Sequence, residues 1–324
     1  TLYSKFPGAS KEAFDYFDTY NWRILQFAAE NRVKNIKVDG DLFIDGTPID
    51  KLPEGLEVKG SIDISNTQIK KLPKGLKVRY SINLSNTQIK KLPKGLSAKR
   101  NLILMETLIE KLPDGLEVGL CLDLRGSQIK KLPEDLKVGS MLYLEGTLVE
   151  ELPKKLYVGG DIDLKGTRIK KLPENFKVWG DLILKETLIE ELPEELEVRG
   201  NLDLSETQIK EIPKGLRVGG NLDLSETQIK ELPEDLHVGE SLDLGRTPIE
   251  KLPEGLHVKG NLNLYGTQIR ELPEGLRVGG SLYLRGTQIE KLPEGLHVGG
   301  WLDLRGTQIE KFPEGLRVGG KIVG

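Results

Sequence analysis

The sequence has few of the residues from which disulfides, metal centres and membrane spans are built. It contains one cysteine, Cys121, so no disulfide can form within the chain. One cysteine and three histidines are too few for the Cys and His clusters of structural zinc sites. No run of about 18 apolar residues is present, which argues against a membrane span. Disulfide-stapled and cysteine-rich metal folds are therefore excluded, and we expect neither a cofactor nor a metal.

The chain also lacks an excess of charge of one sign and a visible targeting segment. Its 47 basic and 50 acidic residues give a formal net charge of −3. A protein that binds nucleic acid mainly through phosphates normally has a strong basic excess, so nucleic acid is not expected as the principal partner. No signal peptide is visible, but the chain begins at Thr1, and a leader or longer N-terminus could precede it. The sequence is compatible with a cytoplasmic location and with secretion.

One feature dominates the sequence, a repeat of 20 residues. The pair first seen at Leu52-Pro53 occurs fourteen times without insertion or deletion, with Ile212-Pro213 and Phe312-Pro313 as the two altered versions. One unit reads V-G-G-x-L-D-L-x-G-T-x-I-x-x-L-P-x-G-L-x. Such regularity predicts one elongated solenoid in which each coil packs on its neighbours.

The positions within one repeat predict a short strand and a continuous core. In residues 201–220, Leu202 and Leu204 alternate around Asp203, which is typical of a strand with one buried face. Stacked coils would then form a parallel sheet. Five further side chains are expected to point inward: Thr207, Ile209, Ile212, Leu216 and Val218. Twenty residues with a proline leave no room for a helix in each coil, so extended backbone is expected opposite the sheet.

A turn is expected at the position of Gly215. Across fourteen coils this position holds nine Gly, two Asp and one Asn, all of which tolerate a positive φ. Only Lys155 and Glu195 differ, and we expect local strain or a different turn at those two residues.

The pattern L-x-L-x-x-T-x-I-x-x-L-P-x-G-L resembles leucine-rich repeat proteins, and most closely the short 20-residue kind of bacterial effector proteins and phage reading frames. The resemblance covers residues 36–324, and it implies a repeat solenoid of about 14 coils with stacked parallel β-strands and little or no helix in the repeats. It also implies a role in protein–protein interaction. The chain has Thr where the family usually has Asn, from Thr47 to Thr307, with Ser127 as the exception. We expect each hydroxyl to bond to a turn backbone as an internal ladder; the alternative is an exposed ice-binding face.

The two ends differ from the repeats. Residues 1–35 are rich in aromatics and are expected to form an N-terminal helical cap, with Ser10 as N-cap and with Phe14, Phe17, Asn21, Leu25 and Ala28 at helical spacing. The alternative is a partner-binding or targeting helix. Residues 317–324 begin another coil and have no such cap. Either a following region has been removed, or this edge docks on another chain, including a second copy.

No enzymatic constellation stands out, so we expect a non-enzymatic protein. A phosphate-binding loop and a Ser/His/Asp grouping are both missing. The histidines His237, His257 and His297 share one column with arginines, which favours a solvated basic edge over a metal site. The early coils are locally basic, which supports an alternative function as a binder of anionic ligands or nucleic acid. A structural, self-assembling rod is a further alternative.

A binding site is expected on the outward positions of the sheet. The middle strand position is rich in aspartate, either by repeat inheritance or as an acidic recognition face, and includes Asp163, Ile183, Asp203, Asp223 and Asp243. Three consecutive strands instead carry apolar side chains expected to point outward, with Leu120 beside them: Ile103, Met105, Cys121, Met141 and Tyr143. A solvent-facing group of this kind is typical of an interface, although drift in older repeats is the alternative. A weaker aromatic group follows: Tyr265, Tyr283 and Trp301.

Overall fold

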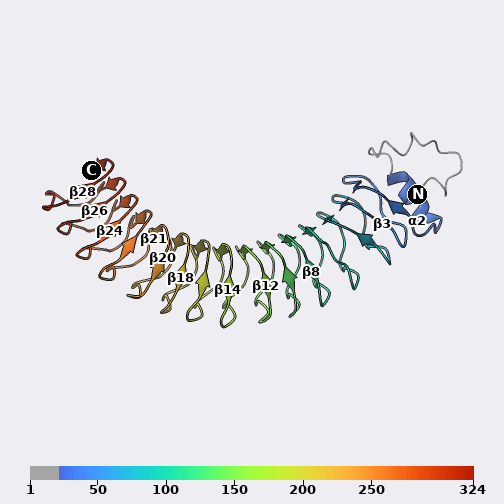
Figure 1. Cartoon of the computed structure of the whole chain (residues 1–324), viewed down its shortest axis with the longest axis horizontal. Helices are drawn as coiled ribbons and strands as arrows, with labels where there is room; N and C mark the ends of the chain where they lie inside the picture. The colour runs from blue at the N-terminus through green and yellow to red at the C-terminus, as the bar shows by residue number, and fades with distance from the viewer. Residues whose placement is uncertain (1–21) are drawn as a thin grey trace. The chain divides into compact units, whose positions relative to one another are not determined.

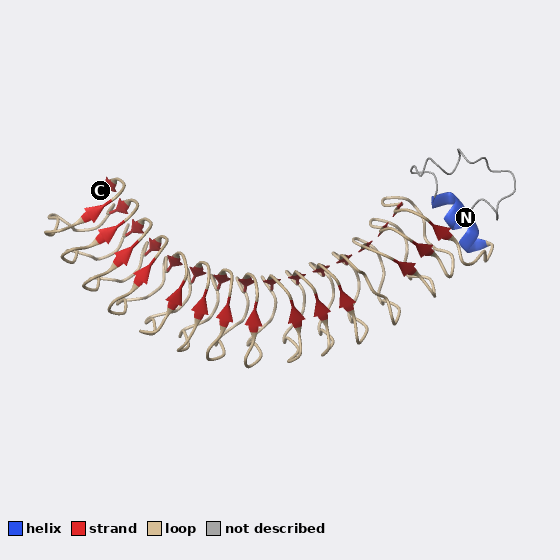
Figure 2. Ribbon diagram, in the orientation of Figure 1, coloured by secondary structure: helices blue, strands red, loops and turns tan. Residues whose placement is uncertain are grey.

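The computed structural model describes residues 22–324 of the chain. These residues fall into two compact units, an N-terminal unit that ends at Gly160 and a C-terminal unit, Asp161–Gly324. Within each unit, successive coils stack side by side (Figure 1). Each regular coil has two short strands, which are joined by long loops (Figure 2). The expected repeat solenoid with parallel strands and almost no helix is confirmed.

Among residues 22–324 one helix, α2 (Trp22–Glu30), precedes the coils of the N-terminal unit. Its buried side chains are Leu25 and Ala28, which the sequence placed at helical spacing. Gln26 joins the helix to the first coil, because its amide donates to the carboxylate of Asp50 at 2.8 Å and accepts from the Asp50 N–H at 3.2 Å. The other residues expected in the cap, Ser10, Phe14, Phe17 and Asn21, lie outside the described residues. A capping role over residues 1–35 stays a prediction. No helix among residues 22–324 is long and apolar enough to cross a bilayer.

The main sheet of the N-terminal unit is parallel, and successive strands pair one repeat apart, as Ile62 with Ile82 and Leu102 with Leu122. A second, narrower ladder forms where each coil turns back, and it is interrupted in the coil that has Ser97 and Ala98 in place of a charged residue and Val. The main strands are β2 (Leu42–Phe43), β4 (Ile62–Asp63), β6 (Ile82–Asn83), β7 (Leu102–Ile103), β9 (Leu122–Asp123) and β11 (Leu142–Tyr143). The second ladder contains β1 (Lys37–Val38), β3 (Glu57–Val58), β5 (Lys77–Val78), β8 (Glu117–Val118), β10 (Lys137–Val138) and β12 (Tyr157–Val158).

The C-terminal unit repeats this plan with the same register, as in the pairing of Leu202 with Leu222. Its main strands are β13 (Ile162–Asp163), β15 (Leu182–Ile183), β17 (Leu202–Asp203), β19 (Leu222–Asp223), β21 (Leu242–Asp243), β23 (Leu262–Asn263), β25 (Leu282–Tyr283), β27 (Leu302–Asp303) and β29 (Ile322–Val323). Its second strands are β14 (Lys177–Val178), β16 (Glu197–Val198), β18 (Arg217–Val218), β20 (His237–Val238), β22 (His257–Val258), β24 (Arg277–Val278), β26 (His297–Val298) and β28 (Arg317–Val318).

The core is made of the inward positions that the repeat predicted. In the coil 201–220 all seven are buried, including Leu204 and Ile209 at 0% exposure. Burying one such aliphatic side chain contributes about 1.5–3 kcal/mol, so a column repeated in every coil is the main stabilising element. Because each coil contacts only its neighbours, this core holds the outward side chains in fixed rows.

The threonine column is internal, as expected. Thr227 is fully buried, and its Oγ1 donates to the carbonyl of Leu224 at 2.6 Å. The same bond to the carbonyl three residues earlier occurs at every threonine of the column, at 2.6–2.9 Å. Ser127 is the exception, since its Oγ is buried and has no hydrogen-bond partner. An exposed ice-binding threonine face is therefore wrong.

The turn at the Gly215 position follows the expectation only in part. Glycines there have a positive φ, such as 73° at Gly215, and Glu195 enters the same left-handed region at 55°, where a side chain is strained. Lys155 keeps a negative φ and so makes a different turn. The expectation is wrong for Asp135 and Asp235, which also avoid the left-handed region; each instead accepts the N–H of the glycine one coil earlier.

Candidate functional site

Each main strand lies within a five-residue segment, such as residues 121–125. The second and fourth residues of this segment are core leucines or isoleucines, so the first, third and fifth point out of the coil. In the coil that contains β9, these outward residues are Cys121, Asp123 and Arg125. The strands pair in register, so Ile103 and Tyr143 lie on either side of Asp123. Side chains one repeat apart are therefore neighbours on this face, about 4.8 Å apart along the stack.

The aspartate column at the third position has a local structural role. The Oδ1 atom of Asp203 accepts the N–H of Ser205 at 2.9 Å, and Asp223 and Asp243 make the same bond to the residue two positions on. Such Asx turns satisfy the backbone where the strand ends. Asp163 also makes this turn, to the N–H of Lys165 at 2.9 Å. The turn accounts for Asp or Asn at this position without a partner, and recognition by the acidic column stays a prediction.

In two places an asparagine of this column donates to the aspartate one coil earlier, as Asn83 does to Asp63 at 2.9 Å. Asn263 donates to both oxygens of Asp243 at 3.0 Å. Burial nevertheless raises the pKa of Asp243, with a smaller contribution in the same direction from the charge of Asp223. This part of the column is therefore half-buried and hydrogen-bonded rather than a freely hydrated row of charges.

The first outward position carries a second polar ladder that links one coil to the next. A side-chain oxygen there accepts the N–H of the equivalent residue one coil later, as Asn201 does from Asn221 at 2.8 Å. In the N-terminal unit the ladder begins at Asp41 and passes through Ser61 and Ser81 to Asn101, which accepts the N–H of Cys121 at 3.3 Å. Cys121 has no side-chain oxygen, so the ladder stops there.

The apolar residues singled out in the sequence gather where this ladder stops. They form a patch that we call the sheet-face cluster: Ile103, Met105, Leu120, Cys121, Met141 and Tyr143. Leu120 is 44% exposed, and the other five are half-buried and open to solvent. The expected outward placement on β7, β9 and β11 and the loops beside them is confirmed.

An ion pair lies in the middle of the sheet-face cluster. Asp123 is 5% exposed, and its Oδ2 lies 2.6 Å from Nη2 of Arg125. The guanidinium stacks on the ring of Tyr143, with 5.1 Å from Cζ to the ring centroid, and Nη2 lies 3.6 Å from the sulfur of Met105. The Tyr143 hydroxyl donates to the sulfur of Met141 at 3.0 Å. These contacts hold Tyr143 in one orientation beside the two methionines.

The single cysteine is poorly suited to chemistry. Burial raises the pKa of the Cys121 thiol to about 11, and the carboxylate of Asp123 adds to this effect. The thiol is thus protonated near neutral pH, whereas nucleophilic cysteines have a lowered pKa. Cys121 therefore serves as a small apolar contact in the cluster.

The remaining expected site residues lie in the C-terminal unit. Ile183 is half-buried between Asp163 and Asp203 on the neighbouring strands. Tyr265 and Trp301 are 37% and 54% exposed, and Tyr283 is half-buried. In three successive coils these residues occupy the fifth, third and first places of the five-residue segment around the main strand, so they form a diagonal. The guanidinium carbons of Arg246 and Arg285 lie 5.6 and 5.8 Å from the Tyr265 ring centroid, so two cations flank this aromatic side chain.

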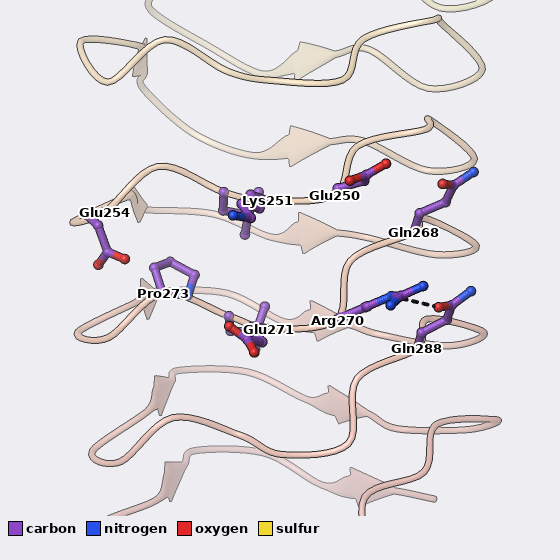
Figure 3. Close-up of a pocket in the computed structure, with 10 residues that line it drawn as sticks. Glu250, Lys251, Glu254, Gln268, Arg270, Glu271, Pro273 and Gln288 are labelled. Atoms are coloured by element: carbon purple, nitrogen blue, oxygen red, sulfur yellow. Dashed lines mark hydrogen bonds between the residues drawn. The ribbon is translucent and has the colours of Figure 1, made fainter.

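The face opposite the main sheet has shallow grooves between successive coils. Figure 3 shows one in the C-terminal unit, lined by Glu250, Lys251, Arg270, Glu271 and Pro273. Arg270 donates to Gln288 at 3.1 Å. The lining of this groove alternates acidic and basic side chains, and it brings no nucleophile into contact with a base. His237, His257 and His297 are exposed on the second ladder, and residues 22–324 contain no group of three His, Cys, Asp or Glu side chains placed to hold a metal.

The sequence did not lead us to expect the polar ladder that ends at the sheet-face cluster. The signal was present, because Asp, Asn or Ser occupies the first outward position in most coils. Cys121, Met141, Trp301 and Lys321 are the departures. A column of small oxygen-bearing side chains at a 20-residue period indicates inter-coil hydrogen bonds, and an apolar departure marks a coil where those bonds are given up.

Comparison with solved structures supports this fold. The chain is similar to YopM, a leucine-rich effector protein from Yersinia pestis, with 19% identity over 98% of this chain and 100% of that chain and a TM-score of 0.56. The fold is thus that of a leucine-rich repeat solenoid. A leucine-rich repeat protein of Leptospira interrogans is 18% identical over 88% of this chain and 94% of that chain, with a TM-score of 0.49. No family model and no curated protein matched the sequence.

Proposed function

We propose that this chain is a non-enzymatic protein-interaction scaffold of the short 20-residue leucine-rich repeat type, and that it binds a partner protein through the sheet-face cluster. The observation that carries the proposal is the replacement of a hydrogen-bonding ladder by an apolar patch centred on Cys121 and Tyr143. Leucine-rich repeat folds present such sheets as extended binding surfaces. The Yersinia pestis relative in fold is an effector protein, which agrees with a role in binding rather than catalysis.

The composition of the cluster suits recognition. Two methionines adapt to the shape of a partner, and a tyrosine and an arginine are the residue types that most often dominate binding energy. The Arg125–Asp123 pair is held among these apolar side chains, so a partner that covers the cluster would shield the pair from water. The proposed mechanism is shape complementarity at Met105, Met141 and Tyr143, with the charged pair fixing orientation.

Affinity capture from a lysate of the source cell tests the proposal. The bait is the whole chain, either unchanged or with Met105→Ser, Met141→Ser and Tyr143→Ser combined. The matched control is Leu188→Ser, which removes an apolar side chain that is 45% exposed but lies outside the cluster. We expect one polypeptide to be retained by the unchanged chain and by the control, and to be lost with the triple variant.

A photo-crosslinking residue in place of Leu120 locates the contact. We expect an adduct with the captured polypeptide from position 120 and none from position 188. Retention by all three baits, together with equal crosslinking at both positions, would contradict binding through the sheet-face cluster.

A further inference from the structure

The two coils at residues 61–100 have a strong excess of positive charge, unlike the chain as a whole. They contain ten Lys and Arg and one acidic residue, Asp63, in a protein whose net charge is −3. Asp63 lies on the main sheet, where its carboxylate accepts from Ser65 and Asn83. The opposite face of these coils therefore has no carboxylate of its own.

Six exposed lysines occupy that opposite face, which we call the lysine face. The sequence K-K-L-P-K-G occurs in both coils and places them at matching positions: Lys70, Lys71, Lys74, Lys90, Lys91 and Lys94. The coils are adjacent, since Ile62 pairs with Ile82, so the two rows lie about 5 Å apart. No ion pair to any of the six occurs among residues 22–324. Repulsion between such rows is relieved when a polyanion binds.

A groove adjoins the lysine face. It has a volume of about 860 Å³, and apolar groups of Trp22, Pro48, Leu52, Leu72 and Pro73 line it beside Lys70 and Lys71. The two carboxylates in its lining are already engaged: Glu54 with Lys34 at 2.7 Å, and Asp50 with Gln26. The site thus combines an open groove that has apolar side chains in its lining, which we call the slot, with a positively charged surface.

We propose that this surface binds an acidic peptide segment of a partner protein, with one bulky apolar side chain in the groove and carboxylates over the lysines. Charge complementarity selects the acidic segment, and the slot beside Trp22 selects the apolar residue. A single-stranded nucleic acid fits less well, because it needs open aromatic faces for stacking, and the guanidinium of Arg23 lies over the Trp22 ring at 5.6 Å. A membrane fits less well, because the apolar side chains that insert into a bilayer protrude from the protein surface, whereas Leu52 is buried in the groove wall.

Fluorescence anisotropy with a labelled peptide of six glutamates around a central phenylalanine tests the proposal. We expect binding that weakens at least about tenfold between about 50 and about 300 mM salt, because exposed charges are screened. We expect Lys71→Glu combined with Lys91→Glu to weaken binding at least about tenfold. The matched control, Lys171→Glu with Lys251→Glu, changes the same repeat positions in the C-terminal unit and should leave binding unchanged.

The apolar slot is tested with the peptide rather than the protein, so that folding is not at issue. Replacing the central phenylalanine with alanine should weaken binding several-fold. Absent peptide binding, or equal loss in both double variants, would overturn the proposal. Tighter binding of an oligothymidine or of phosphatidylserine vesicles than of the peptide would also overturn it. None of these results bears on the sheet-face cluster, which lies on the other face of the coils.

Discussion

At the scale of single residues, the threonine column shows how one hydroxyl stabilises each coil. Every threonine of the column donates to the carbonyl three residues earlier, and Ser127 alone leaves its buried Oγ without a partner. A buried hydroxyl without a hydrogen bond costs about 1–3 kcal/mol. The column is therefore optimised everywhere except at one coil.

Ser127→Thr is expected to stabilise the chain. The threonine rotamer used elsewhere in the column would place its Oγ1 on the carbonyl of Leu124, and the added methyl group would be buried. We expect a gain of about 1 kcal/mol in the free energy of unfolding, measured by urea denaturation. Thr147→Ser is the matched control and should destabilise; equal effects of the two substitutions would contradict the assigned role.

The raised pKa of Cys121 predicts slow alkylation. At pH 8 a thiol with a pKa of about 11 has roughly a hundredfold less thiolate than one near 9. Reaction with iodoacetamide should therefore be roughly a hundredfold slower in the folded chain than in urea, and should accelerate up to pH 11. A folded-state rate that levels off below pH 9 would contradict the burial of the thiol.

The Asp303–Arg305 pair predicts a pH-dependent stability. The hydrogen bond from Arg305 lowers the pKa of Asp303, so the pair stabilises the fold above the unfolded carboxyl pKa and is lost as pH falls through the folded value. Because solvent screens the arginine, Asp303→Asn should cost at most about 1 kcal/mol at pH 7, and this cost should shrink as pH falls through the folded pKa of Asp303. Arg305→Gln should show the same trend in urea denaturation; a cost independent of pH for both would refute it.

At the scale of the repeat, the strand and core positions could be predicted from the sequence, whereas the second ladder could not. The alternation Leu202–Asp203–Leu204 defines a buried face, but the second strands, such as β18 (Arg217–Val218), have only two residues and no period to detect. From the sequence alone, the Gly-Gly pair that follows these strands predicts only a turn. Where the first of these positions is glycine, as at Gly239, the backbone approaches that of the preceding coil closely, although other coils have Asp, Lys, Arg or Trp there.

Gly239→Ala is expected to disrupt the stack at that coil. A Cβ there would collide with the carbonyl oxygen of Gly219, so the two backbones would have to shift apart at this point of the ladder. We expect a loss of more than about 2 kcal/mol in the free energy of unfolding. Gly40→Ala, where a Cβ meets nothing within 4 Å, should cost less than about 0.5 kcal/mol. Equal costs would contradict this packing.

At the scale of the whole molecule, repetition makes the fold readable and conceals the function. Any column can be inherited through duplication, and the aspartate column illustrates this, because Asx turns explain it without a partner. The sheet-face cluster was identified from its departure from the repeat. The hydrogen bond that is lost at Cys121 could not be predicted, because the partner of residue 121 lies one coil away. Only the structure shows the polar ladder that stops there. Self-association of the chain stays a prediction, which sedimentation over a range of concentrations would test.

The central claim is that Cys121 and Tyr143 serve binding rather than folding. Cys121→Asn combined with Tyr143→Asn restores the repeat pattern. The amide introduced at position 121 can accept the N–H of Met141, as Asn201 does from Asn221, and the amide introduced at position 143 can form the Asx turn seen at Asn83. We expect the free energy of unfolding to stay level or rise by about 1 kcal/mol, while partner retention falls at least about tenfold. Undiminished retention, or a loss of stability that accompanies the loss of binding, would contradict the account.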